Sequence, residues 1–129
     1  KLTPGERVRL LVRSAAERVT ADKVVDGVWF IGGGSHNSVA IEMKDHLILV
    51  EAPLSEGRTG PVIDEVRKLA PKKPIRYVIN SHQHFDHSGG LRTAAGEGAT
   101  IVTQAQNKAY FESAWPAVVG SLEKKYAAK

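Results

Sequence analysis

The most informative stretch of the sequence is residues 80–90, which read Asn80-Ser81-His82-Gln83-His84-Phe85-Asp86-His87-Ser88-Gly89-Gly90. Three of the five histidines and one aspartate fall within six residues of this stretch, with the spacing His-x-His-x-Asp-His. Placing several polar groups side by side at the end of a buried strand is costly unless they serve a purpose. The cluster therefore predicts metal binding. Because imidazole and carboxylate groups are present without thiolate, we expect Zn²⁺, with Fe or Mn as alternatives.

The position of the cluster also favours a functional site. It follows the apolar run Ile75 to Ile79, which is typical of a buried strand. His82 and His84 are two residues apart, so in extended backbone both imidazoles point to the same side and can reach one metal. Asp86 and His87 come later, where the chain turns toward a helix, and can point to a second position nearby. In proteins with open α/β sheets, functional sites lie beyond the carboxyl ends of the strands, and the cluster has this position relative to the expected strand.

The segments around the cluster alternate between strand and helix patterns. The expected strands are Val24 to Ile31 with a turn at Asp26-Gly27, Ser38 to Met43, His46 to Val50, Ile75 to Ile79, and Thr100 to Val102. The expected helices are Pro4 to Val19, Gly60 to Ala70, Gly89 to Ala95, and Gln104 to Ala114. His46 to Val50 is nearly all apolar, which predicts a central, buried strand. The order of elements indicates a layered α/β protein with a mixed β-sheet flanked by helices.

The first 20 residues are expected to form an extension that precedes the main domain. Thr3, Pro4 and Glu6 give a helix start with a capping box, and a narrow apolar stripe follows at helical spacing. We therefore divide the chain into an amphipathic helical extension, residues 1–20, and a domain, residues 21–129. No apolar stretch follows the basic start, so we expect no signal peptide.

Composition argues against several classes of protein. The chain has 129 residues, 42% of them hydrophobic and 25% charged, as is ordinary for a soluble domain. It has no cysteine, so disulfides and thiolate ligands are excluded, and the compartment, cytoplasmic or periplasmic, stays open. The net charge of +4 is scattered, so we expect no nucleic-acid partner. No apolar run reaches the roughly 20 residues of a membrane helix, so we expect no membrane partner.

The histidine cluster resembles the metal-binding signature of the metallo-β-lactamase-fold hydrolases, and the likeness extends over about Val24 to Trp115. The flanking order is also similar: the strand Gly27-Val28-Trp29-Phe30-Ile31, then Asn37-Ser38-Val39-Ala40, then a strand that ends in an acidic residue. That residue is Glu51 here, where the family more often has Asp, and a role in positioning the ligands would survive the change.

The resemblance implies an αββα sandwich, of which this chain forms the N-terminal half. The family's fold has two similar β/α halves, and the second half supplies a third histidine to the first metal, a bridging carboxylate and a last histidine. No histidine or aspartate follows His87 in this sequence. We therefore expect the site to be incomplete as this chain carries it.

The resemblance also implies the roles of the cluster residues. His82 and His84 would hold the first metal, and Asp86 and His87 the second, with two zinc ions in a complete site. Asp86 would also act as the catalytic residue that orients the attacking water. The implied reaction is hydrolysis of a small-molecule substrate, in which metal-bound hydroxide attacks a lactam, ester or thioester carbonyl.

For the two remaining histidines, the sequence gives weaker evidence of a functional role. His36 lies in the glycine-rich stretch Gly33 to Ser38, which could border the site. It is either a substrate-binding residue or an ordinary loop histidine, and one histidine in such a loop favours the second interpretation. His46 lies in a strand beside Asp45, and we interpret it as structural.

Two other functions fit the same residues. An iron-dependent, persulfide-oxidising enzyme of the same fold would bind iron rather than zinc, so metal analysis separates it from a zinc hydrolase. A non-catalytic module would bind a metal or a partner through its exposed half-sheet, and mass and oligomeric state bear on that possibility.

The half-domain interpretation also predicts self-association. The second half of the fold would cover apolar sheet surface, which we assign to the face holding Leu47, Leu49, Val78 or Ile101. An uncovered apolar face of this kind favours association between copies of the chain.

Overall fold

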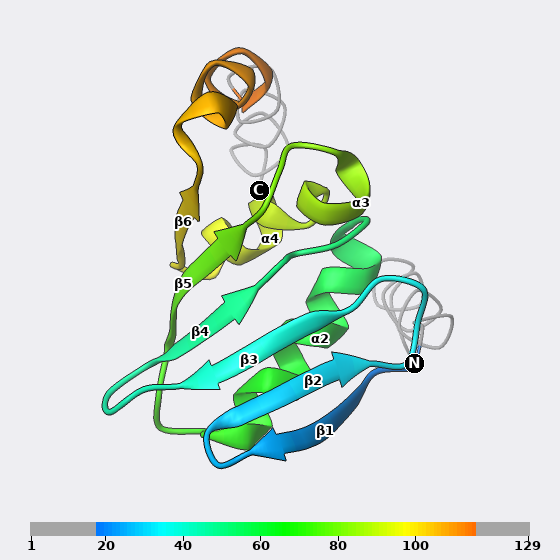
Figure 1. Cartoon of the computed structure of the whole chain (residues 1–129), viewed down its shortest axis with the longest axis vertical. Coiled ribbons are helices and arrows are strands. Elements are labelled where there is room, and N and C mark those ends of the chain that lie inside the picture. The colour runs from blue at the N-terminus through cyan, green and yellow to red at the C-terminus, as the bar shows by residue number, and fades with distance from the viewer. Residues whose placement is uncertain (1–17, 116–129) are drawn as a thin grey trace, which may run out of the picture.

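The computed structural model of the chain describes residues 18–115 (Figure 1). The helix expected over Pro4 to Val19 lies outside these residues, apart from its last two positions. Arg18 and Val19 are not helical, and Thr20 already begins the first strand. The proposed boundary between the extension, residues 1–20, and the domain, residues 21–129, therefore falls inside the first strand.

Six strands form one mixed sheet in which spatial order follows chain order. The strands are β1 (Thr20–Val25), β2 (Val28–Gly32), β3 (Ser38–Glu42), β4 (Leu47–Val50), β5 (Ile75–Asn80) and β6 (Thr100–Thr103). The first four are antiparallel neighbours, whereas β5 lies parallel to β4 and β6 parallel to β5. The mixed sheet is as predicted, and so are the turn at Asp26-Gly27 and the internal position of β4.

Two helices, α2 (Glu56–Leu69) and α4 (Leu91–Gly96), cover one face of this sheet (Figure 1). The described residues also form α3 (Phe85–Ser88), the 3₁₀ turn η1 (Ala105–Asn107) and a helix over residues 108–115. Figure 1 shows α2 and α4 side by side behind the sheet, while α3 lies beyond the end of β5. Within residues 18–115, none of the helices combines the length and the apolar character that crossing a bilayer requires.

The helix α2 begins four residues before the expected start at Gly60. Ser55 has extended backbone and precedes the first turn, and Pro61 lies inside the helix, where sequence reasoning placed its beginning. The early start has a tertiary cause, because it brings Arg58 and Thr59 into the interior, where both side chains are buried.

The core lies between the sheet and these helices. Trp29, Ala40, Leu49, Val78 and Ile101 pair with one another in a row across five strands. Against this row pack the buried helix residues, which are Val62, Ile63, Val66, Leu91 and Ala94. Each fully buried aliphatic side chain of this size contributes about 1.5–3 kcal/mol of hydrophobic stabilisation.

The uncovered face of the sheet is not the one expected from the sequence. Leu47, Leu49 and Val78 are fully buried under the helices, and Ile101 is partly buried against the same core, so the prediction that these residues line an open surface is wrong. The neighbouring row, which is Phe30, Val39, Val50, Ile79 and Val102, lies on the opposite face. Successive side chains of a strand alternate between faces, so an apolar run alone does not say which face the helices cover.

Candidate metal centre

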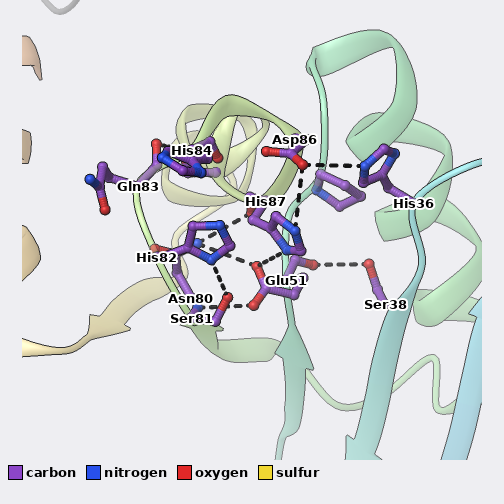
Figure 2. A network of polar contacts seen from close by, with 12 residues as sticks. His36, Ser38, Glu51, Asn80, Ser81, His82, Gln83, His84, Asp86 and His87 are labelled. Carbon is purple, nitrogen blue, oxygen red and sulfur yellow. Dashed lines mark hydrogen bonds and ion pairs between the residues drawn. The ribbon is translucent and has the colours of Figure 1, made fainter.

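The histidine cluster converges at the carboxyl end of β5 (Figure 2). One potential ligand atom from each of His82, His84 and Asp86 lies within 4.8 Å of the other two. His87 joins the same locus, because its ring centroid is 4.3 Å from that of His82 and its Nε2 is 3.6 Å from Oδ2 of Asp86. The structure therefore brings together all four residues that the sequence assigned to the site.

The backbone of the motif turns from an irregular segment into one helical turn. His82 to His84 follow β5 without regular structure, and α3 then carries Asp86 and His87. The Ser88 hydroxyl donates to the carbonyl oxygens of Gln83, at 2.7 Å, and His84, at 3.0 Å, which closes the turn. The sequence predicted the next helix over Gly89 to Ala95, so the helical turn within the motif is a difference from expectation.

The imidazole of His82 is oriented by its neighbour Ser81. The hydroxyl of Ser81 lies 2.9 Å from Nδ1 of His82, which makes Nε2 the nitrogen better placed to bind a metal. Histidine ligands commonly use one ring nitrogen for the metal and the other for such an orienting hydrogen bond.

Glu51 connects the end of β4 to the motif. Its Oε1 accepts a hydrogen bond of 2.9 Å from the backbone nitrogen of Ser81, and its Oε2 lies 3.5 Å from Nδ1 of His87. Asn80 donates to Oε2 from its side-chain amide, at 3.4 Å. The backbone of Glu51 has φ of 67°, in the left-handed region that costs a non-glycine residue about 1 kcal/mol or more. This strained residue thus sits where it positions His87 and the metal-binding loop.

A buried polar network supports the loop from the other side, and sequence reasoning did not identify it. Asn80 is 2% exposed and accepts a hydrogen bond from the Thr103 hydroxyl, at 3.3 Å, at the end of β6. Gln104 donates from its amide to the Ser81 carbonyl oxygen, at 2.6 Å. The available signal was a polar residue at the end of each of two neighbouring parallel strands.

Two glycines after the motif allow close packing against the segment between β4 and α2. A Cβ atom on Gly89 would lie 2.0 Å from the Leu54 carbonyl oxygen, and one on Gly90 would lie 1.9 Å from Oγ1 of Thr59. The Gly90 backbone nitrogen donates to the Ala52 carbonyl oxygen, at 2.9 Å. Glycine is therefore required at both positions by packing against other parts of the chain.

The loop between β2 and β3 places His36 beside the cluster. Its Nε2 lies 3.4 Å from Oδ2 of Asp86, and its ring stands edge-on to that of His87 with centroids 5.9 Å apart. Figure 2 shows the His36 side chain facing Asp86 from across the site. The loop therefore borders the site, and whether His36 contacts substrate stays a prediction.

His46 is far from this locus along the sheet, because it precedes β4 whereas Glu51 follows it. Its Nδ1 lies 2.6 Å from the Asp45 carboxylate, to which Arg76 donates at 3.1 Å. The His46 imidazole and the Arg76 guanidinium hold the pKa of the Asp45 carboxyl below its ordinary value. These contacts agree with the structural role assigned to His46.

The donor set suits a divalent metal. Zinc accepts both imidazole nitrogen and carboxylate oxygen, and ligand atoms on one tetrahedral zinc are separated by about 3.3 Å. Groups already within 4.8 Å need only small side-chain rotations to reach that spacing. The residues present therefore fit a metal ion.

Residues 31–124 match the family model described as the metallo-beta-lactamase superfamily. This span contains β3 to β6, the metal-binding motif and α2. The chain belongs to the metallo-β-lactamase superfamily.

Solved structures of metallo-β-lactamases share the fold. The enzyme FIM-1 from Pseudomonas aeruginosa, in its mono-zinc form, is 28% identical with a TM-score of 0.60 over 68% of this chain and 42% of that one. A metallo-β-lactamase from Hirschia baltica is 25% identical with a TM-score of 0.64 over 74% of this chain and 48% of that one.

Curated relatives carry other activities. A linear primary-alkylsulfatase from a Pseudomonas species is 32% identical over 76 residues, which are 58% of this chain and 11% of the relative. The alpha subunit of a 2,4-dinitroanisole O-demethylase from Nocardioides sp. (strain JS1661) is 31% identical over 71 residues, 55% of this chain and 22% of the relative. The matched part of the chain thus spans less than half the length of each of these four proteins.

Proposed function

We propose that this chain carries part of the active site of a zinc-dependent hydrolase. The observation that carries the proposal is the convergence of His82, His84 and Asp86 to within 4.8 Å beyond the end of β5. His87 and Glu51, whose carboxylate lies 3.5 Å from Nδ1 of His87, extend the same cluster. Membership of the superfamily and the likeness to metallo-β-lactamase structures support the proposal.

The chain's residues divide the work as follows. His82 and His84 would hold one zinc ion, and Asp86 and His87 a second. Zinc bound at such a site lowers the pKa of a coordinated water to about 7 and polarises the bond to be cleaved. The Asp86 side chain is 33% exposed, so water can reach it, and its carboxylate would accept a hydrogen bond from the attacking water. Glu51 holds His87 in place.

The names of the similar proteins suggest candidate substrate classes for this chain. The solved structures are β-lactamases, and the curated relatives are named for an alkyl sulfate and for the O-methyl group of 2,4-dinitroanisole. We propose a small molecule with a lactam, ester or thioester carbonyl, and we add the sulfate ester as a further substrate to assay.

Metal content tests the proposal first. The purified chain is equilibrated with zinc, iron and manganese together, and bound metal is measured by elemental analysis. We expect zinc, and we expect the double variant His82→Ala/His84→Ala to lose it, because both ligands of one metal are removed. The matched control is His46→Ala, which removes a histidine outside the site and should leave zinc content unchanged.

Activity is tested separately with a chromogenic lactam, a thioester, a carboxylic ester and an aryl sulfate.

Three outcomes would count against the proposal. Unchanged zinc content in the His82→Ala/His84→Ala variant would contradict it. Selective binding of iron would instead favour the persulfide-oxidising alternative. A chain that binds metal but cleaves no substrate, even when supplied with the remainder of a complete domain, would favour the non-catalytic module.

A further inference from the structure

The loop between β2 and β3, residues 33–37, carries one side chain into the metal site and is held by another. We name it the His36 loop. His36 reaches Asp86 with Nε2 at 3.4 Å from Oδ2, and its Nδ1 lies 2.9 Å from the Ser35 hydroxyl. Both ring nitrogens therefore have a polar neighbour, which fixes the plane of the imidazole as it faces Asp86.

The Arg58 side chain holds this loop through hydrogen bonds. It lies in the first turn of α2 and is only 2% exposed. Its Nη2 donates to the carbonyl oxygens of Gly32 and His36, both at 3.1 Å. These residues stand at the two ends of the loop, so one nitrogen ties the ends together. Nη1 donates to the Arg18 carbonyl oxygen, at 3.3 Å, which anchors the same guanidinium to the segment before β1.

Two further contacts fix the path of the loop. Gly33 has φ of 95°, and a Cβ atom there would lie 2.2 Å from the Arg18 carbonyl oxygen, so only glycine fits. Just after the loop, the Ser38 hydroxyl donates to the Glu51 carbonyl oxygen, at 3.0 Å. Arg58 thus holds both ends of the loop, and Ser38, which follows the loop, connects it to Glu51, the residue that positions His87.

We propose that His36 and Arg58 are positioning residues for Asp86: Arg58 fixes the His36 loop, and His36 holds the Asp86 carboxylate in its metal-binding orientation. The proposal rests on the proposed function, because it concerns a ligand of the same site. Burying a guanidinium is expensive, and the expense is offset here by hydrogen bonds to backbone oxygens that border the site. Partners that orient a metal ligand commonly change metal affinity by about 10- to 100-fold.

The proposal makes a prediction that a general stabilising role does not. His36 acts on the metal through Asp86, so the effects of removing the two side chains must be coupled. His36→Ala should weaken zinc binding about 10-fold or more in the chain that has Asp86. In the Asp86→Ala background, the same substitution should change zinc affinity by no more than about 2-fold.

The experiment is a double-mutant cycle with zinc as the probe, titrated against a competing chelator. Arg58→Met should weaken zinc binding in the same direction as His36→Ala, and the His36→Ala/Arg58→Met double variant should bind no more weakly than the weaker single variant. His46→Ala is the matched control and should bind like the unsubstituted chain. Equal losses from His36→Ala with and without Asp86, or no loss at all, would overturn the proposal.

A readout without metal keeps the proposal testable on its own. The imidazole nitrogen signals of His36, observed by NMR at one fixed pH, should shift in Asp86→Asn and in Arg58→Met but not in His46→Ala. If the chain binds no zinc, the proposed function fails while this measurement still decides the contact. Unshifted His36 signals in Asp86→Asn would exclude it. Arg58→Lys, which retains the charge, replaces Arg58→Met if the latter does not fold by circular dichroism.

Discussion

The Glu51 carboxylate accepts a 2.9 Å hydrogen bond from the backbone nitrogen of Ser81, 30 residues further along the chain. This bond joins the ends of two neighbouring parallel strands, β4 and β5. The same carboxylate lies 3.5 Å from Nδ1 of His87, so one acidic side chain fixes both the start of the metal-binding loop and one of its histidines. Glu51 is therefore one of the residues through which the sheet fixes the position of the motif.

Replacing Glu51 should weaken metal binding although the residue is not among the expected ligands. Glu51→Ala removes the acceptor for Ser81 and the anionic partner of His87, and we expect zinc affinity to fall by about 10- to 100-fold. Glu51→Gln retains an oxygen for the Ser81 backbone nitrogen and should lose less. Zinc titration of both variants checks this order, and equal affinities of Glu51→Ala and the unsubstituted chain would contradict it.

Gly89 should tolerate no side chain. A Cβ atom there would meet the Leu54 carbonyl oxygen at 2.0 Å, and that oxygen belongs to backbone that cannot rotate away. Gly89→Ala should lower the free energy of unfolding by about 1–3 kcal/mol, as overpacked sites do. Gly96→Ala is the control, because nothing lies within 4 Å of a Cβ atom at Gly96 and it is helical. That variant should be neutral or up to about 1 kcal/mol more stable in urea denaturation.

Local patterns were sufficient to predict most of the sheet and the position of the cluster. The apolar runs before Glu51 and before Asn80 gave β4 and β5, and the His-x-His-x-Asp-His spacing gave the site. What the sequence did not reveal depends on contacts between distant segments. In the sequence, Arg58 looks like an ordinary charged residue, because its hydrogen bonds to the carbonyl oxygens of Gly32 and His36 are known only from the structure. The covered face of the sheet likewise depends on where α2 and α4 pack.

The N-terminal extension can be separated from the domain only if the cut respects β1. Deleting residues 1–17 leaves the Arg18 carbonyl oxygen for Arg58, the packing of Val19 against the core and the pairing of Thr20 with Gly32. We expect this truncated chain to retain metal binding. Deleting residues 1–20 removes all three contacts and should lower thermal stability further. Circular dichroism and zinc titration of the two truncations test the boundary, and equal stability would show that these contacts contribute little.

Self-association should depend on the face opposite the helices. Phe30, Ile79 and Val102 are 41%, 38% and 44% exposed and belong to one row of side chains on that face. If the chain associates through this surface, Ile79→Lys should shift it toward monomer in sedimentation velocity, because a buried lysine would oppose the contact. Met43→Lys is the control, at an exposed position in the turn between β3 and β4, and it should not change the association state. Equal shifts in both variants would exclude this face.

The purified 129-residue chain should be a poor catalyst as a monomer. A hydrolytic zinc site typically needs three protein ligands and an open position for water. Residues 18–115 bring His82, His84 and Asp86 together, with His87 beside them, and the sequence has no histidine or aspartate after His87. Under the proposed division, in which His82 and His84 hold one metal and Asp86 and His87 the other, each metal has only two protein ligands. A ligand replaced by water weakens metal affinity and leaves the attacking water poorly oriented.

We therefore expect fewer than two tightly bound zinc ions per monomer and only weak hydrolysis of a chromogenic lactam or a thioester. Zinc per chain and turnover are measured on the fraction that sedimentation identifies as monomer, since an associated form can share ligands between copies. His82→Ala/His84→Ala supplies the background rate. Robust turnover by a monomer that holds two tightly bound zinc ions would show that the half-site interpretation is wrong.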